Sequence, residues 1–187
     1  LNDALVRRDF TFNGSDSLFF DGENRKVEAI QNAANAQVYG AQFGLEAKLN
    51  SDFSFAQQLN FQKGEEELEN GKTSPSRHAA PLFGISKLSF QKKKFLVELS
   101  LLYADKVSFE NLNVEEKEKP EIYANDSEGR PYSPSWYTLN LKAQYIISKA
   151  ITANLGVENL TNQRYRTYSS GIAAAGINFV SSITAKF

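Results

Sequence analysis

The sequence has no cysteine and a single histidine among its 187 residues. The lack of cysteine excludes a disulfide framework, a thiolate metal site and a cysteine nucleophile, and one histidine cannot form a histidine cluster. No apolar run approaches the ~18 residues that a membrane-spanning helix needs, so any membrane role must use β-strands. With 21 basic and 22 acidic residues there is no basic excess, and nucleic acid is not an expected partner.

Methionine is also absent, even at position 1, and the chain does not open with a basic segment followed by an apolar one. We therefore expect the sequence to be a C-terminal piece of a longer precursor, or a trimmed product. The composition, 41% hydrophobic and 12% aromatic, suits a soluble protein as well as a barrel with a polar lumen. Composition alone does not choose between these classes.

The last twelve residues, 176–187, alternate between apolar and polar side chains. Ile177, Phe179 and Ile183 share one face of an extended strand, and the chain ends on the aromatic Phe187. This pattern is typical of the last strand of a Gram-negative outer-membrane β-barrel. Phe187 is therefore the candidate assembly signal, with the barrel-assembly machinery as its expected partner.

Other segments carry the same alternation between aromatic residues that stand eight positions apart. The pairs are Phe53/Phe61, Phe95/Tyr103, Tyr137/Tyr145 and Phe179/Phe187. Eight steps of ~3.3 Å, tilted by ~40°, give a band roughly 20 Å tall, close to the ~25 Å apolar belt of outer-membrane barrels. Between the aromatics, side chains such as Leu99, Leu141 and Ile183 are predicted to face lipid, and Gln57 is the one polar intruder. The opposite faces are polar.

The aromatic residues are also predicted to form two membrane girdles, because rings favour the level of the lipid headgroups. One girdle, on the side of the short turns, contains Phe53, Phe90, Phe95, Tyr145 and Phe187. The other contains Tyr39, Phe61, Tyr103 and Tyr137. Trp136 is next to Tyr137 of the second girdle, so it is predicted to lie on the opposite face of the strand.

Short and long connections alternate along the chain, as periplasmic turns and extracellular loops do in outer-membrane barrels. Strands are predicted near 36–49, 53–62, 82–91, 95–105, 135–147, 150–158 and 176–187, with a further one at 1–8. The long loops are 63–81, 106–133 and 159–175, and a fourth is expected at 9–32. The prediction is an antiparallel, up-and-down arrangement of about eight strands.

One motif resembles a known family. The segment NLTNQRY (159–165) follows a predicted strand and precedes GINF (176–179) and the terminal Phe187. This arrangement resembles the C-terminal signature of TonB-dependent outer-membrane receptors. NAQVYG (35–40), with Glu46, and the entry at Pro81 to LFG (82–84) are similar to earlier strands of that family. The resemblance covers nearly the whole chain, although AGIN (175–178) stands where many members have proline-glycine-arginine.

The resemblance implies an all-β fold, with residues 1–187 forming about eight C-terminal strands of a 22-stranded transmembrane barrel. A plug domain and the segment that contacts TonB would lie outside this chain. Such receptors sit in the cell outer membrane and import a scarce small-molecule ligand, such as an iron-siderophore, haem, cobalamin or a glycan. The implied protein is a transporter rather than an enzyme, without catalytic residues or a cofactor.

Two predicted extracellular loops hold candidate ligand contacts. Arg77 and His78 could contact an anionic siderophore or haem iron, although a plain loop histidine is the other interpretation. A hydrolytic Ser76–His78 pair is disfavoured, because side chains at i and i+2 diverge on an extended chain.

The last long loop and the acidic runs each allow two interpretations. Arg164, Tyr165 and Arg166 in the last loop face a ligand or the plug, or pack between loops. The acidic runs 65–69 and 115–118 fit a solvated loop better than a cation site, because they lack the spaced ladder of a calcium loop. No metal site is predicted.

Two other protein classes remain open from the residues alone. One is a self-contained eight-stranded outer-membrane barrel of the structural or adhesin kind. The other is a soluble β-sandwich or a lipocalin-like binding module. The membrane interpretation requires Leu99, Leu141 and Ile183 to touch lipid, and it fails if they pack inside a dry two-layer core.

Overall fold

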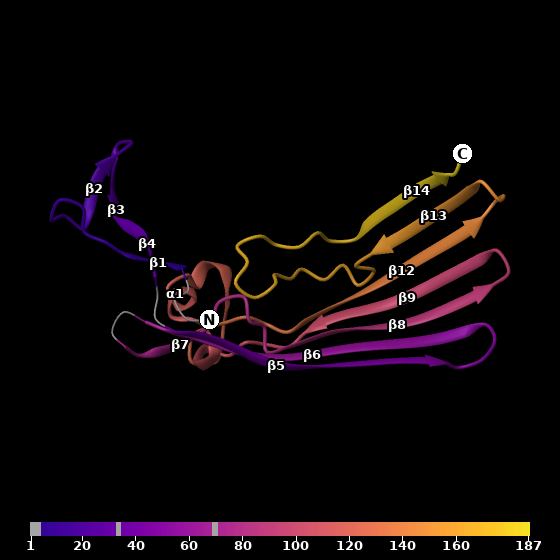
Figure 1. Ribbon diagram of the computed structural model, residues 1–187, viewed down its shortest axis with the longest axis horizontal. Coiled ribbons are helices and arrows are strands. Elements are labelled where there is room, and N and C mark those ends of the chain that lie inside the picture. Colours follow the sequence, from indigo (N-terminus) through magenta and orange to yellow (C-terminus); the bar gives the residue numbers. More distant parts are fainter. Residues whose placement is uncertain (1–4, 33–34, 69–70) are drawn as a thin grey trace.

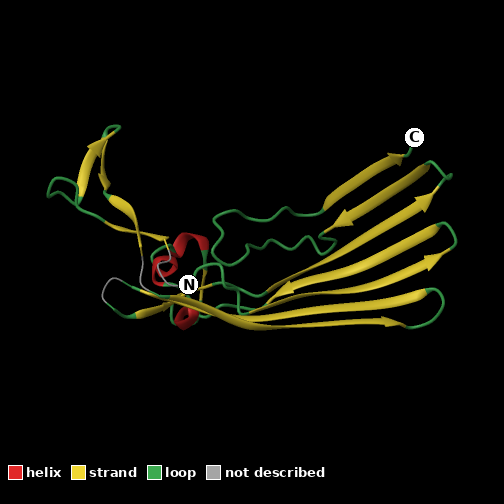
Figure 2. Ribbon diagram, viewed as in Figure 1, coloured by secondary structure: helices red, strands yellow, loops and turns green. Residues whose placement is uncertain are grey.

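One antiparallel sheet of eight strands dominates the computed structural model, which describes residues 5–32, 35–68 and 71–187 (Figure 1, Figure 2). Its strands are β5 (Ala36–Lys48), β6 (Phe53–Glu67), β8 (Leu82–Lys92), β9 (Phe95–Ala104), β12 (Trp136–Ile146), β13 (Ile151–Glu158), β14 (Asn178–Ala185) and the short β7 (Thr73–Pro75). The order β14-β13-β12-β9-β8-β6-β5, with β7 beside β6, confirms the predicted up-and-down arrangement. The main difference in length is β6, which continues past 62 to Glu67.

The segment predicted as a strand at 1–8 does not join this sheet. Its described part is β1 (Leu5–Asp9), which pairs with β4 (Glu28–Asn32), and residues 1–4 lie outside the described residues. Between them, β2 (Ser17–Phe20) pairs with β3 (Glu23–Lys26). The segment RRD (7–9) lacks the apolar alternation of a wall strand, and the two hairpins project from the sheet (Figure 1).

The sheet has a short-turn end and a long-loop end. Tight turns join β5 to β6, β8 to β9 and β12 to β13 at the short-turn end. At the first of them, Asn50 Oδ1 accepts hydrogen bonds from the backbone N–H groups of Asp52 and Phe53. At the other end, the longest loop carries η1 (Phe109–Asn111), α1 (Val114–Lys117), η2 (Pro120–Ile122), β10 (Ala124–Asn125) and β11 (Pro131–Tyr132). Among the described residues, no helix has the length and apolar character needed to cross a bilayer.

Strand register places the apolar side chains on one face, as predicted. Directly opposite pairs on this apolar face are Leu139/Leu101, Leu141/Leu99, Ala143/Val97, Ala153/Ile183 and Val157/Phe179. Leu99, Leu141 and Ile183 are exposed by 37%, 38% and 75% of their area. They therefore do not lie in a dry two-layer core, which removes the main objection to a lipid-facing wall.

Several of the predicted girdle aromatics meet across strands. Tyr137 lies opposite Tyr103, and Tyr145 lies opposite Phe95. The rings of Phe53 and Phe90 are 4.9 Å apart between centroids, near the same end of the sheet as Tyr145. The register thus gathers aromatic rings toward each end of the apolar face. Their placement at the headgroup level of a membrane stays a prediction.

The other face of the sheet is polar. Opposite pairs on this polar face include Asn140/Ser100, Lys142/Glu98 and Asn154/Ser182. Lys87 shares the face with Ile85, and its Nζ lies 3.7 Å from Glu98 Oε1. The charged residues of the wall therefore gather on the side that would face a barrel lumen.

Gln57, the polar intruder on the apolar face, has its own hydrogen-bonding partners. Its Nε2 donates to Tyr103 Oη at 2.8 Å, and its Oε1 accepts from Ser86 Oγ at 2.5 Å. Tyr103 reaches Gln57 by crossing over Gly84, where a Cβ atom would come within 2.6 Å of Tyr103 Oη. The glycine thus leaves the space in which a tyrosine of β9 can serve an amide of β6.

Replacing Tyr103 with phenylalanine should destabilise the protein by about 1–3 kcal/mol, because one N–H of the part-buried Gln57 amide would lose its acceptor. Urea unfolding of the detergent-solubilised protein measures this change. Tyr137→Phe is the matched control, since Tyr137 lies opposite Tyr103 and is half exposed. Equal losses for the two variants would show that the Gln57 contact contributes nothing.

The two edge strands run in the same direction. Six antiparallel steps separate β5 from β14, so both strands run toward the short-turn end. If the sheet closed on itself, these edges would meet in a parallel seam, whereas single-chain bacterial barrels have even strand numbers and antiparallel neighbours. This geometry argues against a self-contained barrel and favours pairing of both edges with further strands.

Candidate functional site

The long loops pack together into one small core at the long-loop end of the sheet. Leu112, Val107 and Tyr168 are its buried apolar members. Asn113 joins the loops, because its Nδ2 donates to Glu66 Oε1 at 2.6 Å and to the Pro75 carbonyl at 2.7 Å. Its backbone N–H donates to Tyr168 Oη at 3.2 Å. We call this unit, built by Glu66 and by residues from 74–80, 107–123 and 168–169, the loop core.

Glu116 is a carboxylate at the centre of the loop core, with only 1% of its side chain exposed. Tyr123 Oη donates to Glu116 Oε2 at 2.5 Å, Lys119 Nζ lies 3.1 Å from Oε1, and Arg77 Nε lies 3.3 Å from the same oxygen. Burial pushes the pKa of Glu116 upward, but the hydrogen bonds from Tyr123 and Lys119 outweigh it and leave the pKa below its ordinary value. Burial and the bond to Glu116 raise the pKa of Tyr123.

Two of the predicted ligand contacts belong to this loop core or its surface. Arg77 Nη1 lies 2.5 Å from Glu115 Oε2, so its guanidinium bridges Glu115 and Glu116. His78 is exposed and has a positive φ of 60°. Arg77 therefore ties one loop to the next. Among the described residues, no group of three or more histidine, aspartate or glutamate side chains is arranged to hold a metal ion.

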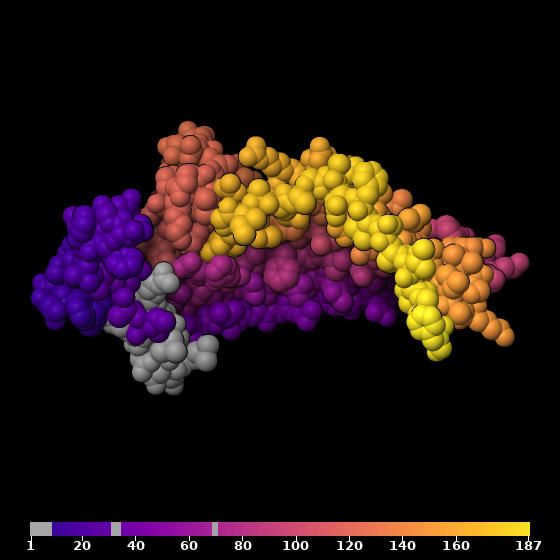
Figure 3. Space-filling view, turned by 90° about the horizontal axis from the view of Figure 1, so that it is seen from above, coloured from indigo at the N-terminus to yellow at the C-terminus, as the bar shows by residue number. Residues whose placement is uncertain are grey.

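The other three predicted contacts come together in a separate cavity. Tyr165 stacks on Trp136, with ring centroids 4.2 Å apart and an interplanar angle of 26°. Arg166 Nη1 donates to the Ile122 carbonyl at 3.0 Å, which joins the last loop to the loop after β9. Arg164, Tyr165 and Arg166 line a cavity of about 350 Å³ between these loops. We call it the mouth cavity. In Figure 3 the two loops lie next to each other over the sheet, in gold and salmon.

The last loop takes its shape from Asn159, the first residue of the motif that carried the resemblance. This side chain is 4% exposed, and its φ of 50° is one that asparagine tolerates. Its Nδ2 donates to the carbonyls of Gln163, at 2.9 Å, and Ala175, at 3.0 Å. Its Oδ1 accepts from the Gln163 N–H, and its own N–H donates to Asn140 Oδ1 on β12. Asn159 therefore holds both limbs of the loop against the sheet.

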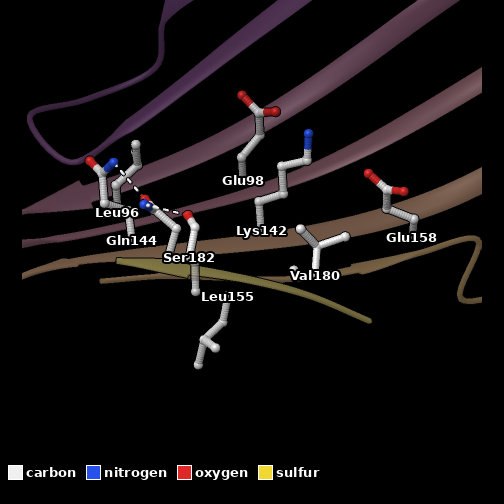
Figure 4. A pocket seen from close by; sticks show the side chains of 11 residues that line it. Leu96, Glu98, Lys142, Gln144, Leu155, Glu158, Val180 and Ser182 are labelled. Carbon is white, nitrogen blue, oxygen red and sulfur yellow. Dashed lines mark hydrogen bonds between the residues drawn. The ribbon is translucent and has the colours of Figure 1, made fainter. Parts of the chain in front are cut away.

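A second cavity lies on the polar face of the sheet. It measures about 340 Å³ and is lined by Lys87, Glu98, Lys142, Glu158 and Tyr165 among others. We call it the polar-face cavity. A neighbouring hollow of about 350 Å³ shares Glu98, Lys142 and Glu158 with it. Figure 4 shows these three charged side chains on one side of the sheet and Leu155 on the other.

A ladder of amides and a hydroxyl continues across the same face toward the sheet edge. Gln144 Nε2 donates to Asn154 Oδ1 at 2.9 Å, and Asn154 Nδ2 donates to Ser182 Oγ at 3.2 Å (Figure 4). These bonds satisfy the amides of β12 and β13 within the wall itself. Charged groups of this face also have partners in the wall, because Lys87 Nζ lies 3.7 Å from Glu98 Oε1 and Asn178 Nδ2 donates to Glu158 Oε2 at 3.4 Å.

Sequence reasoning missed how these sites are joined. Tyr165 is the one described residue that lines both the mouth cavity and the polar-face cavity. The sequence places Trp136 on the opposite strand face from the second girdle, but nothing in the sequence signals its contact with Tyr165. Glu116 appeared as one carboxylate in an acidic run, and its burial depends on loop packing that no local pattern encodes.

Comparisons with known proteins agree with this geometry. No protein-family profile and no curated protein sequence matches the chain. Solved structures do match its shape. A ferric enterobactin receptor variant from Pseudomonas aeruginosa, in complex with enterobactin, superposes with a TM-score of 0.66 at 16% identity over 100% of this chain and 28% of its own. The FrpB iron transporter from Neisseria meningitidis gives a TM-score of 0.67 at 13% identity, over 100% and 27%.

The copper transporter OprC also matches, with a TM-score of 0.66 at 14% identity over 86% of this chain and 24% of its own. The chain thus spans about a quarter of the length of these structures. All three are TonB-dependent receptors. The fold of the chain is that of the C-terminal part of their β-barrel.

Proposed function

We propose that this chain forms the C-terminal part of the barrel of a TonB-dependent outer-membrane receptor that takes up a scarce small-molecule ligand. One observation carries the proposal. Seven long antiparallel strands present one continuous apolar face, one polar face and two unpaired edges, in the fold of such receptors. Lipid would cover the apolar face, and further strands would pair the edges.

In this proposal the chain contributes the wall and part of the ligand-binding mouth. The loop core keeps three loops in one arrangement, and the mouth cavity presents Arg164, Tyr165 and Arg166 to a ligand. Arg77 supports the loops through its bonds to Glu115 and Glu116, and His78 remains a surface candidate. The chain performs no covalent chemistry. TonB would act through segments beyond those described, and the barrel-assembly machinery would recognise the strand ending at Phe187.

The names of the matched structures indicate a broad class of ligand. The matched structures are named as receptors or transporters for ferric enterobactin, iron and copper. An iron-siderophore, haem, cobalamin or a glycan would be taken up at the mouth and passed along the polar face. Uptake that continues unchanged in a strain without TonB would contradict the transport part of this proposal.

Replacing Leu141 with arginine should destabilise the protein by about 2–4 kcal/mol, because a charge near the middle of the lipid-facing surface must leave water. Leu141 lies opposite Leu99 on one side and Val157 on the other, all on the apolar face. Heat-modifiable migration of the outer-membrane protein on gels, with urea unfolding in lipid, measures the loss. The folded, faster-migrating form should decrease.

Leu96→Arg is the matched control, since Leu96 lies opposite Gln144 on the polar face and lines the hollow beside Glu98. We expect this variant to stay within about 1 kcal/mol of the parent, because water and Glu98 solvate the new charge. An equal loss of stability from both substitutions would refute the lipid-facing wall. A Leu141→Arg protein that stays folded and is recovered from the soluble fraction would refute it as well.

A further inference from the structure

The mouth cavity combines two kinds of group, aromatic rings and guanidinium groups, from two loops of the chain. The stacked rings of Trp136 and Tyr165 give it a flat, firm apolar wall. Arg164 is exposed and Arg166 half-buried in the same lining. Glu121 is the only acidic residue among the described residues that line it. The cavity is therefore both aromatic and cationic.

These groups define the chemistry of a ligand. A guanidinium presents several donors in one plane, which suits a carboxylate or a similar anion. An aromatic wall binds the flat face of an aryl ring or of a sugar. The volume of about 350 Å³ is at the lower end of small-molecule sites, so it fits one ring with its substituent.

We infer that the mouth cavity binds an anionic group carried on a single ring, with Arg164 holding the anion and the Trp136–Tyr165 pair contacting the ring. This inference rests on the proposed function and narrows it to one part of the ligand. Arg166 is a positioning residue, because its Nη1 is bonded to the Ile122 carbonyl and keeps the two loops together. Arg164 is exposed at the cavity and projects from the loop that Asn159 shapes.

The position of Tyr165 places the bound ring next to the polar-face cavity. Its side chain borders the mouth cavity and also the polar-face cavity with Lys87, Glu98 and Lys142. A ring bound against the Trp136–Tyr165 pair therefore lies beside the space that leads along the polar face. Tyr165 forms a wall that the two cavities share.

The only tryptophan of the chain reports on this cavity, so its fluorescence can test the inference. The full-length protein in detergent is titrated with benzoate and its neutral counterpart benzyl alcohol, and with glucuronate and its neutral counterpart glucose. We expect one of the two anions to change Trp136 fluorescence saturably, at a concentration at least tenfold below that of its neutral counterpart. Benzoate alone would identify an aryl acid as the source of the anion, and glucuronate alone a sugar acid.

Three variants test whether the fluorescence change arises in the mouth cavity. Arg164→Gln should raise the half-saturating concentration about tenfold, whereas Arg25→Gln, a change on the β2–β3 hairpin outside the cavity lining, should leave it unchanged. Trp136→Phe gives the signal from sources other than the cavity. Equal responses to the neutral compounds and the anions, or no saturable response in a protein that still shows heat-modifiable migration, would overturn the inference. A protein without that migration would instead contradict the proposed function.

Discussion

Glu116→Ala should loosen the loop core, at a cost of about 1–3 kcal/mol to the local stability of the loops. The carboxylate is buried, hydrogen-bonded to Tyr123 and Lys119 and ion-paired with Arg77, so its removal leaves Lys119 and the Tyr123 hydroxyl without this partner, while Arg77 keeps Glu115. Hydrogen exchange should rise for the amides of residues 107–123. The amides of β9 and β12 should remain protected, because the sheet does not depend on this contact.

Glu115→Ala is the matched control for this prediction. The neighbouring carboxylate also pairs with Arg77, but its side chain is 52% exposed. Exposed ion pairs contribute about 0–1 kcal/mol, so exchange in this variant should resemble that of the parent. Exchange that rises equally in both variants would mean that the burial of Glu116 has no special role.

The same residue predicts a dependence on pH. Folding lowers the pKa of Glu116 below its ordinary value of 4.5, so its contribution is fully present above that value. The contribution disappears as the pH falls through the lower value of the folded state. The exchange difference between the parent and Glu116→Gln should therefore be largest at neutral pH, begin to fall below about pH 4.5 and vanish once the pH lies below the lowered pKa of the folded state. A difference that is constant with pH would contradict this assignment.

The wall of the sheet could be predicted from the sequence because it follows a local rule. Side chains alternate between two faces with a period of two, so apolar positions such as Leu99 and Leu141 identify one face without any tertiary information. Strand β8 also follows the rule, because Leu88 lies opposite Leu99 on the apolar face and Lys87 lies opposite Ser100 on the polar face. The segment at 1–8 shows the limit, because a short strand with no such alternation leaves its pairing undetermined.

The candidate site was predictable only as a set of residue types. Arg164, Tyr165 and Arg166 stood out as charged and aromatic residues in a long loop, and the structure brings them to one cavity. Arg77, chosen for the same reasons, is instead bonded to Glu115 and Glu116. The difference arises from contacts between loops that are distant in sequence, and side-chain chemistry alone does not encode those contacts.

Asn159→Asp should disrupt the last loop, at a cost of about 1–3 kcal/mol. The side-chain nitrogen donates to the carbonyls of Gln163 and Ala175, and an ionised aspartate has no donor for either. These part-buried bonds contribute about 0.5–1.5 kcal/mol apiece, and each carbonyl would face a carboxylate oxygen in place of an N–H group. Urea unfolding followed by Trp136 fluorescence measures the loss, because Trp136 stacks on Tyr165 of the same loop.

Asn162→Asp makes the same chemical change in the same motif and separates geometry from charge. Asn162 uses its Oδ1 to accept from the Ile177 N–H at 3.1 Å, a role that a carboxylate oxygen fills equally well. Its φ of 47° is also one that aspartate tolerates. We therefore expect Asn162→Asp to stay within about 1 kcal/mol of the parent. Similar losses at both positions would mean that negative charge in this loop, and not the two donors of Asn159, determines its stability.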